Sequence, residues 1–238
     1  MNCPLKIIRA NLLKGRLRLK GVMSVRYKLL AVDVDGVLTK VNSVWRYLHE
    51  CLDTLGEAAI NAALFREGKI TYEEWAKLDA SLWKGVRVEE IMRVVSGVEL
   101  REGAAELVKL VRERGLEVVA LSAGLSLIAD RVAAELEIDA CLSNELIVRD
   151  GVVTGDVVVR VTCSNKGDLL LKICSERGVE PDQVVVIGDS EADIPMMRVS
   201  GLAIAYNPSS PLVLSCAHLV IISETLRPVV ALLDKLTR

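Results

Sequence analysis

Apolar and polar positions alternate in blocks along the chain and predict a regular succession of strands and helices. Five short apolar runs predict buried strands, at residues 29–34, 117–121, 183–187, 202–205 and 219–222. Amphipathic segments that predict helices lie between or after them, at residues 103–114, 125–136, 167–177 and 228–236. Strands that alternate with helices predict an α/β fold, in which helices cover both faces of a Rossmann-like parallel sheet.

The segment between the first two strands interrupts this alternation. Residues 41–95 are mostly helical in composition, with breaks at glycines, and they are too long for a simple crossover. Within them, Thr71 followed by Glu74 predicts the start of a helix. We therefore expect a small helical cap inserted after the first strand.

A third pattern occupies residues 146–161, where β-branched residues alternate with polar ones. They flank Asp150 and Gly151, a pair that favours a tight turn between two strands. We expect a β-hairpin here, with a second turn at residues 154–156.

These elements divide the chain of 238 residues into three predicted parts. Residues 1–27 are a basic N-terminal extension. Residues 28–40 and 100–238 form the catalytic core, and residues 41–99 form the helical cap.

Composition narrows the classes of function. The formal net charge is −2, which favours neither a nucleic acid nor an anionic membrane as a partner. No apolar run approaches the roughly 18 residues that a membrane-spanning helix needs. The six cysteines have no C-x-x-C spacing and the chain has only two histidines, His49 and His218, so a zinc site is not expected. We expect a cytoplasmic protein with reduced cysteines; its sequence is also compatible with a homodimer.

Two aspartates follow the first predicted strand. Asp33 and Asp35 are two residues apart where the chain must bend, so both carboxylates can face one cavity. Paired carboxylates repel each other unless a cation neutralises them, and Mg²⁺ prefers such oxygen ligands. Taken alone, the pair is better explained as a turn in which the aspartates cap backbone amides.

Other polar clusters follow the later strands, and the carboxyl ends of parallel strands meet at one edge of a sheet. Asp189 and Asp193 add two carboxylates, although they also fit an ordinary helix N-terminus. The segment Ser122-Ala123-Gly124 is a candidate phosphate cradle or a simple strand-to-helix turn. Lys166 is either a fixed charge for phosphoryl oxygens or a solvated surface lysine.

The order of these motifs decides between the alternatives. D-x-D after a strand, Ser after a strand, Lys before a helix and G-D-x-x-x-D after a strand resemble the haloacid dehalogenase superfamily from about Leu29 onward. The resemblance implies a Mg²⁺-dependent hydrolase that forms an aspartyl-phosphate. It implies that Asp33 is the nucleophile and Asp35 the general acid and base, and that Ser122, Ala123, Gly124 and Lys166 bind phosphate. Metal binding is implied for Asp33, Asp35, Asp189 and Asp193, with Asp193 holding metal-bound water or orienting Lys166.

Within that superfamily the hairpin and the motif context resemble the phosphoserine phosphatases. Two positions differ from the amino-acid clamp of that branch: Asn42 replaces a glutamate, and Lys77 is matched with an arginine. Arg87 is a further candidate for substrate specificity in the cap. The aromatic cap residues either line the substrate pocket or pack between helices, and they are Tyr72, Trp75 and Trp83.

We therefore expect a phosphomonoesterase that acts on a small phosphorylated metabolite. One alternative is a phosphatase for a sugar phosphate or sugar-acid phosphate, because residues 33–39 also resemble the first motif of sugar-acid phosphatases. Another is a non-catalytic phosphoryl-binding protein, although such a protein would not need Asp35.

Overall fold

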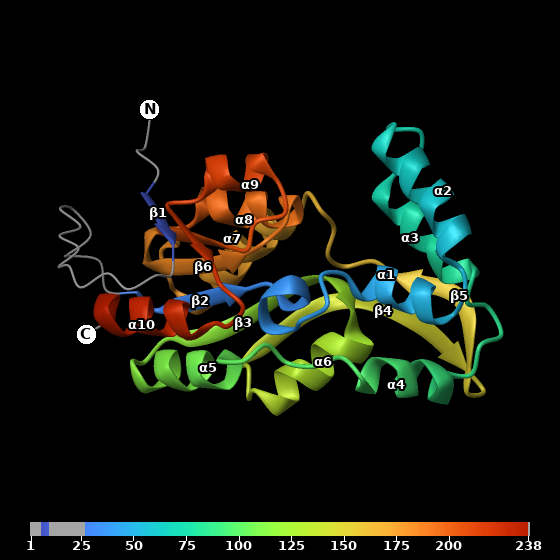
Figure 1. The fold of residues 1–238 in the computed structure, drawn as a ribbon, viewed down its shortest axis with the longest axis horizontal. Helices are drawn as coiled ribbons and strands as arrows, with labels where there is room; N and C mark the ends of the chain where they lie inside the picture. Colours follow the sequence, from blue (N-terminus) through green and yellow to red (C-terminus); the bar gives the residue numbers. More distant parts are fainter. Residues whose placement is uncertain (1–5, 10–26, 238) are drawn as a thin grey trace.

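The computed structural model describes residues 6–9 and 27–237. Most of the predicted N-terminal extension lies outside these residues, but residues 6–9 form an edge strand that was not expected. The molecule is elongated: most of the sheet and its flanking helices lie at one end, and the helices of residues 44–96 lie at the other, beside the hairpin of residues 140–158 (Figure 1). No helix in the described part of the chain is long and apolar enough to cross a membrane.

One sheet of eight strands organises the described residues, in the order β1-β8-β7-β6-β2-β3-β4-β5. The strands are β1 Lys6–Arg9, β2 Leu29–Val32, β3 Glu117–Leu125, β4 Ala140–Arg149, β5 Val152–Val158, β6 Val184–Gly188, β7 Leu202–Tyr206 and β8 Leu219–Ile222. Neighbours are parallel except for β4 and β5, which form the predicted hairpin. The predicted α/β fold is confirmed.

Helices cover both faces of the sheet. They are α1 Val44–Cys51, α2 Leu55–Arg66, α3 Tyr72–Ser81, α4 Val88–Ser96, α5 Ala104–Glu113, α6 Ser126–Glu135, α7 Lys166–Arg177, α8 Ile194–Val199, α9 Pro211–Cys216 and α10 Arg227–Leu236. Helices α5, α6 and α10 lie on one face, whereas α7, α8 and α9 lie on the other (Figure 1).

Strand β2 contributes apolar side chains to the cores on both faces of the sheet. Successive side chains of a strand point to opposite faces. Leu30 and Val32 therefore join the core on the side of α5, while Leu29 and Ala31 join the core on the side of α7. A strand buried on both faces needs a continuous apolar run, as this one has.

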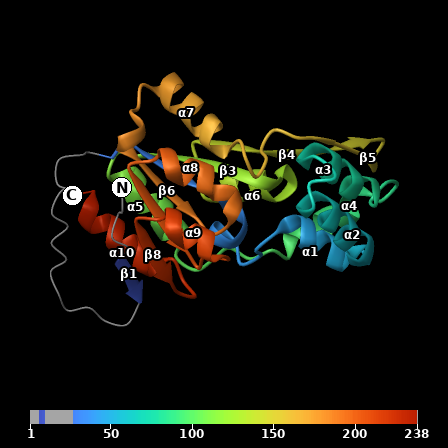
Figure 2. The ribbon, with the colours of Figure 1, turned by 90° about the horizontal axis from the view of Figure 1, so that it is seen from above.

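The four helices α1–α4 follow β2 and lie beside the far end of the hairpin (Figure 2). Thr71 begins α3 with the expected capping box, in which its side chain and that of Glu74 bind each other's backbone N–H. The loop after α3 pairs with β5: Gly85 N–H donates to Val153 O at 2.8 Å, and Val153 N–H donates to Val86 O at 2.9 Å. The helices are thus joined to the sheet by backbone hydrogen bonds.

The prediction of a second turn in the hairpin, at residues 154–156, is wrong. Strand β5 continues through residues 154–156, which bulge where Val148 pairs with Val153 but Leu146 pairs with Val157. The Thr154 hydroxyl donates to Ile147 O at 3.1 Å and satisfies the bulged backbone. The residues Thr154, Gly155 and Asp156 have the composition of a turn, but in the structure they form a bulge within the strand.

Candidate active site

A tight turn after β2 places the first two acids. Asp33 continues the strand, and its N–H donates to Ile187 O of β6 at 3.0 Å. The chain then bends through Val34–Leu38, with Gly36 at a φ of +78° that favours glycine. Asp33 and Asp35 are both buried, and Asp35 Oδ2 accepts the N–H of Val44, the first residue of α1, at 2.8 Å. The start of the helical segment is therefore fixed to Asp35.

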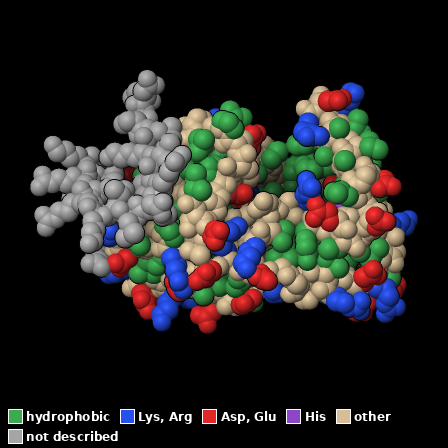
Figure 3. Space-filling view, viewed as in Figure 1, with side chains coloured by type: hydrophobic (Ala, Val, Ile, Leu, Met, Phe, Trp, Pro, Cys, Tyr) green, Lys and Arg blue, Asp and Glu red, His purple; other side chains and the backbone are tan. Residues whose placement is uncertain are grey.

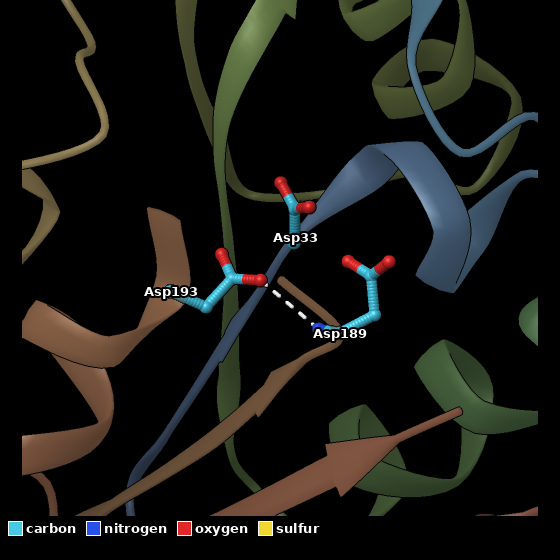
Figure 4. A group of neighbouring side chains, drawn as sticks. All are labelled: Asp33, Asp189 and Asp193. Atoms are coloured by element: carbon cyan, nitrogen blue, oxygen red, sulfur yellow. Dashed lines mark hydrogen bonds between the residues drawn. The ribbon is translucent and has the colours of Figure 1, made fainter. Parts of the chain in front are cut away.

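The second acid pair follows β6, the neighbour of β2 in the sheet. Side-chain oxygens of Asp33, Asp189 and Asp193 lie within 4.8 Å of one another, and Figure 4 shows these three side chains around the end of β2. Asp193 Oδ2 accepts the N–H groups of Asp189 and Ser190, each at 3.0 Å, and the Ser190 hydroxyl at 3.1 Å. One oxygen of Asp193 thus fixes the loop that carries Asp189.

Lys166 joins the two acid motifs. It is the first residue of α7 and is 1% exposed. Its Nζ donates to Asp33 Oδ1 at 2.8 Å and to Asp193 Oδ1 at 2.7 Å. Both oxygens of Asp193 are therefore engaged, which suits a positioning role better than direct ligation of a metal. The surface alternative for Lys166 is wrong.

The Ser122 segment is also at the site, but in a different conformation from the expected turn. Strand β3 continues to Leu125 with a register shift after Leu121, and α6 begins only at Ser126. Gly124 N–H donates to the Ser122 hydroxyl at 3.0 Å. A Cβ on Gly124 would lie 2.8 Å from Asp35 Oδ2, so glycine is required for this close approach.

Asn144 of β4 is a site residue that sequence reasoning missed. Its Nδ2 donates to Ala123 O and to Val161 O, each at 2.9 Å, and its Oδ1 accepts the N–H of Arg160 at 2.8 Å and of Val161 at 2.9 Å. Asn144 is fully buried. It joins the Ser122 segment to the chain that leads to Lys166. The predicted hairpin began only at residue 146, so no predicted strand contained Asn144 and the sequence held no signal for its role.

Arg101 is a second residue that sequence reasoning missed, and it binds the backbone of the turn that carries Asp35. Its Nη2 donates to Gly36 O at 3.0 Å and to Thr39 O at 3.3 Å. Its guanidinium lies over the Tyr206 ring, 5.3 Å from the centroid. These contacts fix both ends of the turn that carries Asp35.

Burial and mutual repulsion disturb the acids of this cluster. Burial, followed by the charges of Asp33 and Asp193, raises the pKa of Asp189 to about 9. Burial, followed by the charge of Asp193, raises the pKa of Asp33 to about 7, and burial raises the pKa of Asp35 to about 6. Burial lowers the pKa of Lys166, but Asp193 and Asp33 raise it more, so the ammonium stays charged.

The donor set fits a divalent cation. Four buried carboxylates meet one ammonium, and Asp189 Oδ1 is buried without a hydrogen-bond partner. Oxygen ligands with excess negative charge are those that Mg²⁺ prefers. Asp33 and Asp189 are the residues best placed to hold such an ion.

The three expected specificity residues have exposed side chains. Lys77 pairs with Asp156, and both side chains are more than half exposed. Arg87 is exposed and pairs with Glu89 at 3.3 Å. Asn42 is exposed in the loop before α1. A role of these three residues in substrate choice stays a prediction.

Comparison with known proteins identifies the family. The sequence model of the haloacid dehalogenase-like hydrolases matches residues 27–201. The chain belongs to this family. It is 35% identical over 195 residues to the phosphoserine phosphatase of Albidiferax ferrireducens, covering 77% of this chain and 80% of that one. It is 30% identical over 192 residues to the phosphoserine phosphatase of Methanocaldococcus jannaschii, covering 77% and 87%.

Solved structures agree with this assignment to the haloacid dehalogenase-like hydrolases. A substrate-bound phosphoserine phosphatase complex matches with a TM-score of 0.77 and 28% identity, covering 87% of this chain and 98% of that one. A phospho-aspartyl intermediate analogue of phosphoserine phosphatase matches with a TM-score of 0.76 and 28% identity, covering 87% and 99%. The chain is therefore a hydrolase of the phosphatase type, similar to phosphoserine phosphatases.

Proposed function

We propose that this hydrolase is a Mg²⁺-dependent phosphomonoesterase for a small phosphorylated metabolite, with Asp33 as the nucleophile. The observation that carries the proposal is the buried Asp33 carboxylate, held by Lys166 and facing Asp189. A similar solved protein is a phospho-aspartyl intermediate analogue, which supports the same chemistry here.

The first step transfers the phosphoryl group to the enzyme. An oxygen of Asp33 attacks phosphorus, and the bond between phosphorus and the leaving oxygen breaks. Asp35, whose pKa is raised to about 6 by burial, gives its proton to that oxygen, so the leaving group departs as a neutral alcohol. The Lys166 ammonium and the Ser122 hydroxyl bind the phosphoryl oxygens.

The second step regenerates the carboxylate. Asp35, now ionised, takes a proton from a water molecule as that water attacks phosphorus. The bond between phosphorus and Asp33 breaks, inorganic phosphate leaves, and Asp35 is again protonated. The hydrogen bond from Val44 N–H holds Asp35 in place for both transfers.

Mg²⁺ would be held by Asp33 and Asp189, with Asp35 beside them. When bound, it neutralises the carboxylates and polarises the phosphoryl oxygens. We assign Asp193 to positioning, because its oxygens already bind Lys166 and the loop of Asp189.

Hydrolysis of p-nitrophenyl phosphate tests the function. We expect turnover with Mg²⁺ and its loss on addition of EDTA, with recovery when Mg²⁺ is restored. Acid quenching during turnover should trap one phosphoryl group on the peptide that contains Asp33, as read by mass spectrometry. The proposal fails if Mg²⁺ supports no turnover of this ester or of a panel of metabolite phosphates.

A further inference from the structure

Two side chains of the helical end bind one backbone oxygen of the Ser122 segment. Trp45 of α1 donates from Nε1 to Ala123 O at 3.1 Å, and the hydroxyl of Tyr72, the first residue of α3, donates to the same oxygen at 3.0 Å. On the face shown in Figure 3, a hollow separates the end of the molecule that carries α2 from the end that carries α7 to α9. The two hydrogen bonds connect the helices to the segment that binds phosphate in the proposed reaction.

The Ala123 carbonyl has more donors than an ordinary backbone acceptor. Asn144 Nδ2 is a third donor, at 2.9 Å, and it also donates to the Tyr72 hydroxyl oxygen at 3.5 Å. A carbonyl oxygen has two lone pairs, so three donors use its full accepting capacity. Burial raises the pKa of the Tyr72 hydroxyl above its usual value, so this group remains a donor across the neutral pH range. The oxygen is thus held from two helices and from strand β4.

The peptide group between Ala123 and Gly124 transmits this restraint. The carbonyl and the N–H of a trans peptide point in opposite directions within one plane, and the described residues contain no cis peptide. The Gly124 N–H therefore faces away from the donors of Ala123 O, and it donates to the Ser122 hydroxyl oxygen at 3.0 Å. The close approach to Asp35 requires glycine here, and glycine restricts its own backbone little. The hydrogen bonds to Ala123 O therefore supply the restriction that a side chain would otherwise give.

The hydrogen bond from Gly124 sets the direction of the Ser122 hydroxyl. A serine hydroxyl donates one hydrogen bond and accepts two. Since the oxygen accepts the Gly124 N–H, the hydroxyl hydrogen points elsewhere, and in the proposed reaction it goes to a phosphoryl oxygen. Linked hydrogen bonds polarise one another, so donors on Ala123 O also make the Gly124 N–H a stronger donor. The restraint on Ala123 thus extends to the group that contacts phosphate.

We propose that Trp45 and Tyr72 are positioning residues for phosphoryl binding, which act through the peptide of Ala123 and Gly124 to orient the Ser122 hydroxyl. Because Ser122 binds the phosphoryl group only in the proposed reaction, this inference rests on the proposed phosphatase function. The phosphoryl group is common to all phosphate esters. The contribution of the two residues should therefore not depend on the leaving group.

Steady-state kinetics of the double variant Trp45→Phe/Tyr72→Phe with Mg²⁺ test this role. The change removes both donors and keeps two aromatic rings. We expect kcat to fall by about tenfold for p-nitrophenyl phosphate and for every metabolite ester that is hydrolysed, with KM changed by less than about threefold, because the lost alignment matters most in the transition state. Tyr47→Phe, which removes a hydroxyl of α1 near Gly97, is the matched control and should keep wild-type kcat. A double-variant kcat within about twofold of wild type, or a loss confined to one ester, would overturn the inference.

A Ser122→Ala background separates positioning from a merely structural role. If Trp45 and Tyr72 act through the Ser122 hydroxyl, the double substitution should lower kcat by less than about twofold where that hydroxyl is absent. An equal fold loss of kcat in both backgrounds would overturn the inference. If the double variant does not fold, Tyr72→Phe alone gives the same comparison.

Nuclear magnetic resonance observes the peptide itself. Ala123-Gly124 is the only Ala-Gly pair in the sequence, so protein labelled with ¹³C at alanine carbonyls and ¹⁵N at glycine gives one coupled signal from this peptide. We expect inorganic phosphate with Mg²⁺ to shift this signal in the wild type and to shift it less in the double variant. An equal shift in both proteins would overturn the inference.

The activity of the wild type separates the two proposals. Turnover of p-nitrophenyl phosphate without a loss of kcat in the double variant rejects the positioning role alone. No turnover of any ester by the wild type rejects the phosphatase proposal and the positioning role with it.

Discussion

The sheet side of the site and its helical side are built from different kinds of side chain. On the sheet side, buried charges meet: Lys166 binds Asp33 and Asp193, and Asp193 fixes the loop of Asp189. On the helical side, a small recess between α1 and α3 is mainly aromatic, and the described residues that line it are Trp45, Tyr72, Trp75, Ala76 and Asp79. The first arrangement supplies the charges of the reaction, whereas Trp45 and Tyr72 of the second bind the Ala123 carbonyl with neutral donors. Substitutions on the sheet side should therefore have the larger effect on kcat.

The largest expected effect is on the sheet side, from Asp33→Asn. An amide does not attack phosphorus, so we expect kcat for p-nitrophenyl phosphate to fall by at least about 10³-fold. The fold should persist, because the amide is similar in shape and needs no counter-ion. Phosphatase assays measure kcat, and circular dichroism shows whether the fold persists. Asp168→Asn, on the exposed first turn of α7, is the control and should keep wild-type activity. Activity close to wild type in Asp33→Asn would refute the assignment of the nucleophile.

The next largest effect is expected from Lys166→Met. This change removes the fixed positive charge at the phosphoryl oxygens and leaves Asp33 and Asp193 without their shared partner. We expect kcat to fall by about 100-fold, as for other fixed groups that stabilise a developing charge. The ratio of kcat/KM for p-nitrophenyl phosphate to that for phosphoserine should change little. Lys172→Met on the exposed side of the same helix is the control. A loss of kcat no larger than that of Trp45→Phe/Tyr72→Phe would remove the distinction between the two sides.

A smaller effect is expected from Asn144→Ala. Removal of the amide takes a donor from the Val161 carbonyl and the shared acceptor from the N–H groups of Arg160 and Val161. We expect a loss of about 2 kcal/mol in the free energy of unfolding, measured by urea titration, because unsatisfied buried groups are costly. We also expect kcat to fall by about tenfold as the Ser122 segment shifts. Ser143→Ala is the neighbouring control. Unchanged stability in Asn144→Ala would show that the network is dispensable.

The smallest effect concerns metal and pH. Burial and mutual repulsion raise the pKa of Asp33 to about 7 and of Asp189 to about 9, above the values of unfolded carboxyl groups near 4. The folded state therefore binds more protons than the unfolded state across this window, and metal-free stability should fall as pH rises from 5 to 9. Lys166 stays protonated in both states over this range and does not change the sign.

Thermal melts in EDTA and in Mg²⁺ measure this effect. Mg²⁺ at about 100 times its Kd should raise Tm by roughly 5–10 °C at pH 8.5. The increase should be smaller at pH 6, where protons compete for the same carboxylates. An increase that does not depend on pH would show that the cluster is not where the ion acts.

The sheet side was largely predictable from the sequence, for a physical reason. Parallel strands buried on both faces require uninterrupted apolar runs, and polar residues at their carboxyl ends must meet at one edge. Position at strand ends made Asp33 and Asp189 candidates, but the order of the motifs and the family resemblance were needed to assign their roles and that of Lys166. The ends of strands were less predictable. Strand β3 continues past Ser122 to Leu125, and this was missed because the register shift that places Gly124 against Asp35 has no hydrophobic pattern in the sequence.

The helical side was less predictable, because packing decides there which aromatic residue is accessible. Trp75 lines the recess, whereas Trp83 is fully buried and packs on His49 and Trp45. Both tryptophans lie in similar helical sequence, and periodicity does not separate them. The importance of Asn144 was missed for the same reason: its hydrogen bonds reach segments that are distant in sequence.

The backbone pairing between the loop after α3 and strand β5 has a consequence for protein engineering. Gly85, Val86 and Val88 exchange hydrogen bonds with Val153 and Gly151. A chimaera that replaced residues 41–99 alone with the cap of a relative would remove the loop that forms these backbone hydrogen bonds with the edge of β5. Residues 140–158 would have to be transplanted with those helices. The unit that can be exchanged between relatives is therefore discontinuous in sequence, and recombination at a single pair of crossover points does not transfer it.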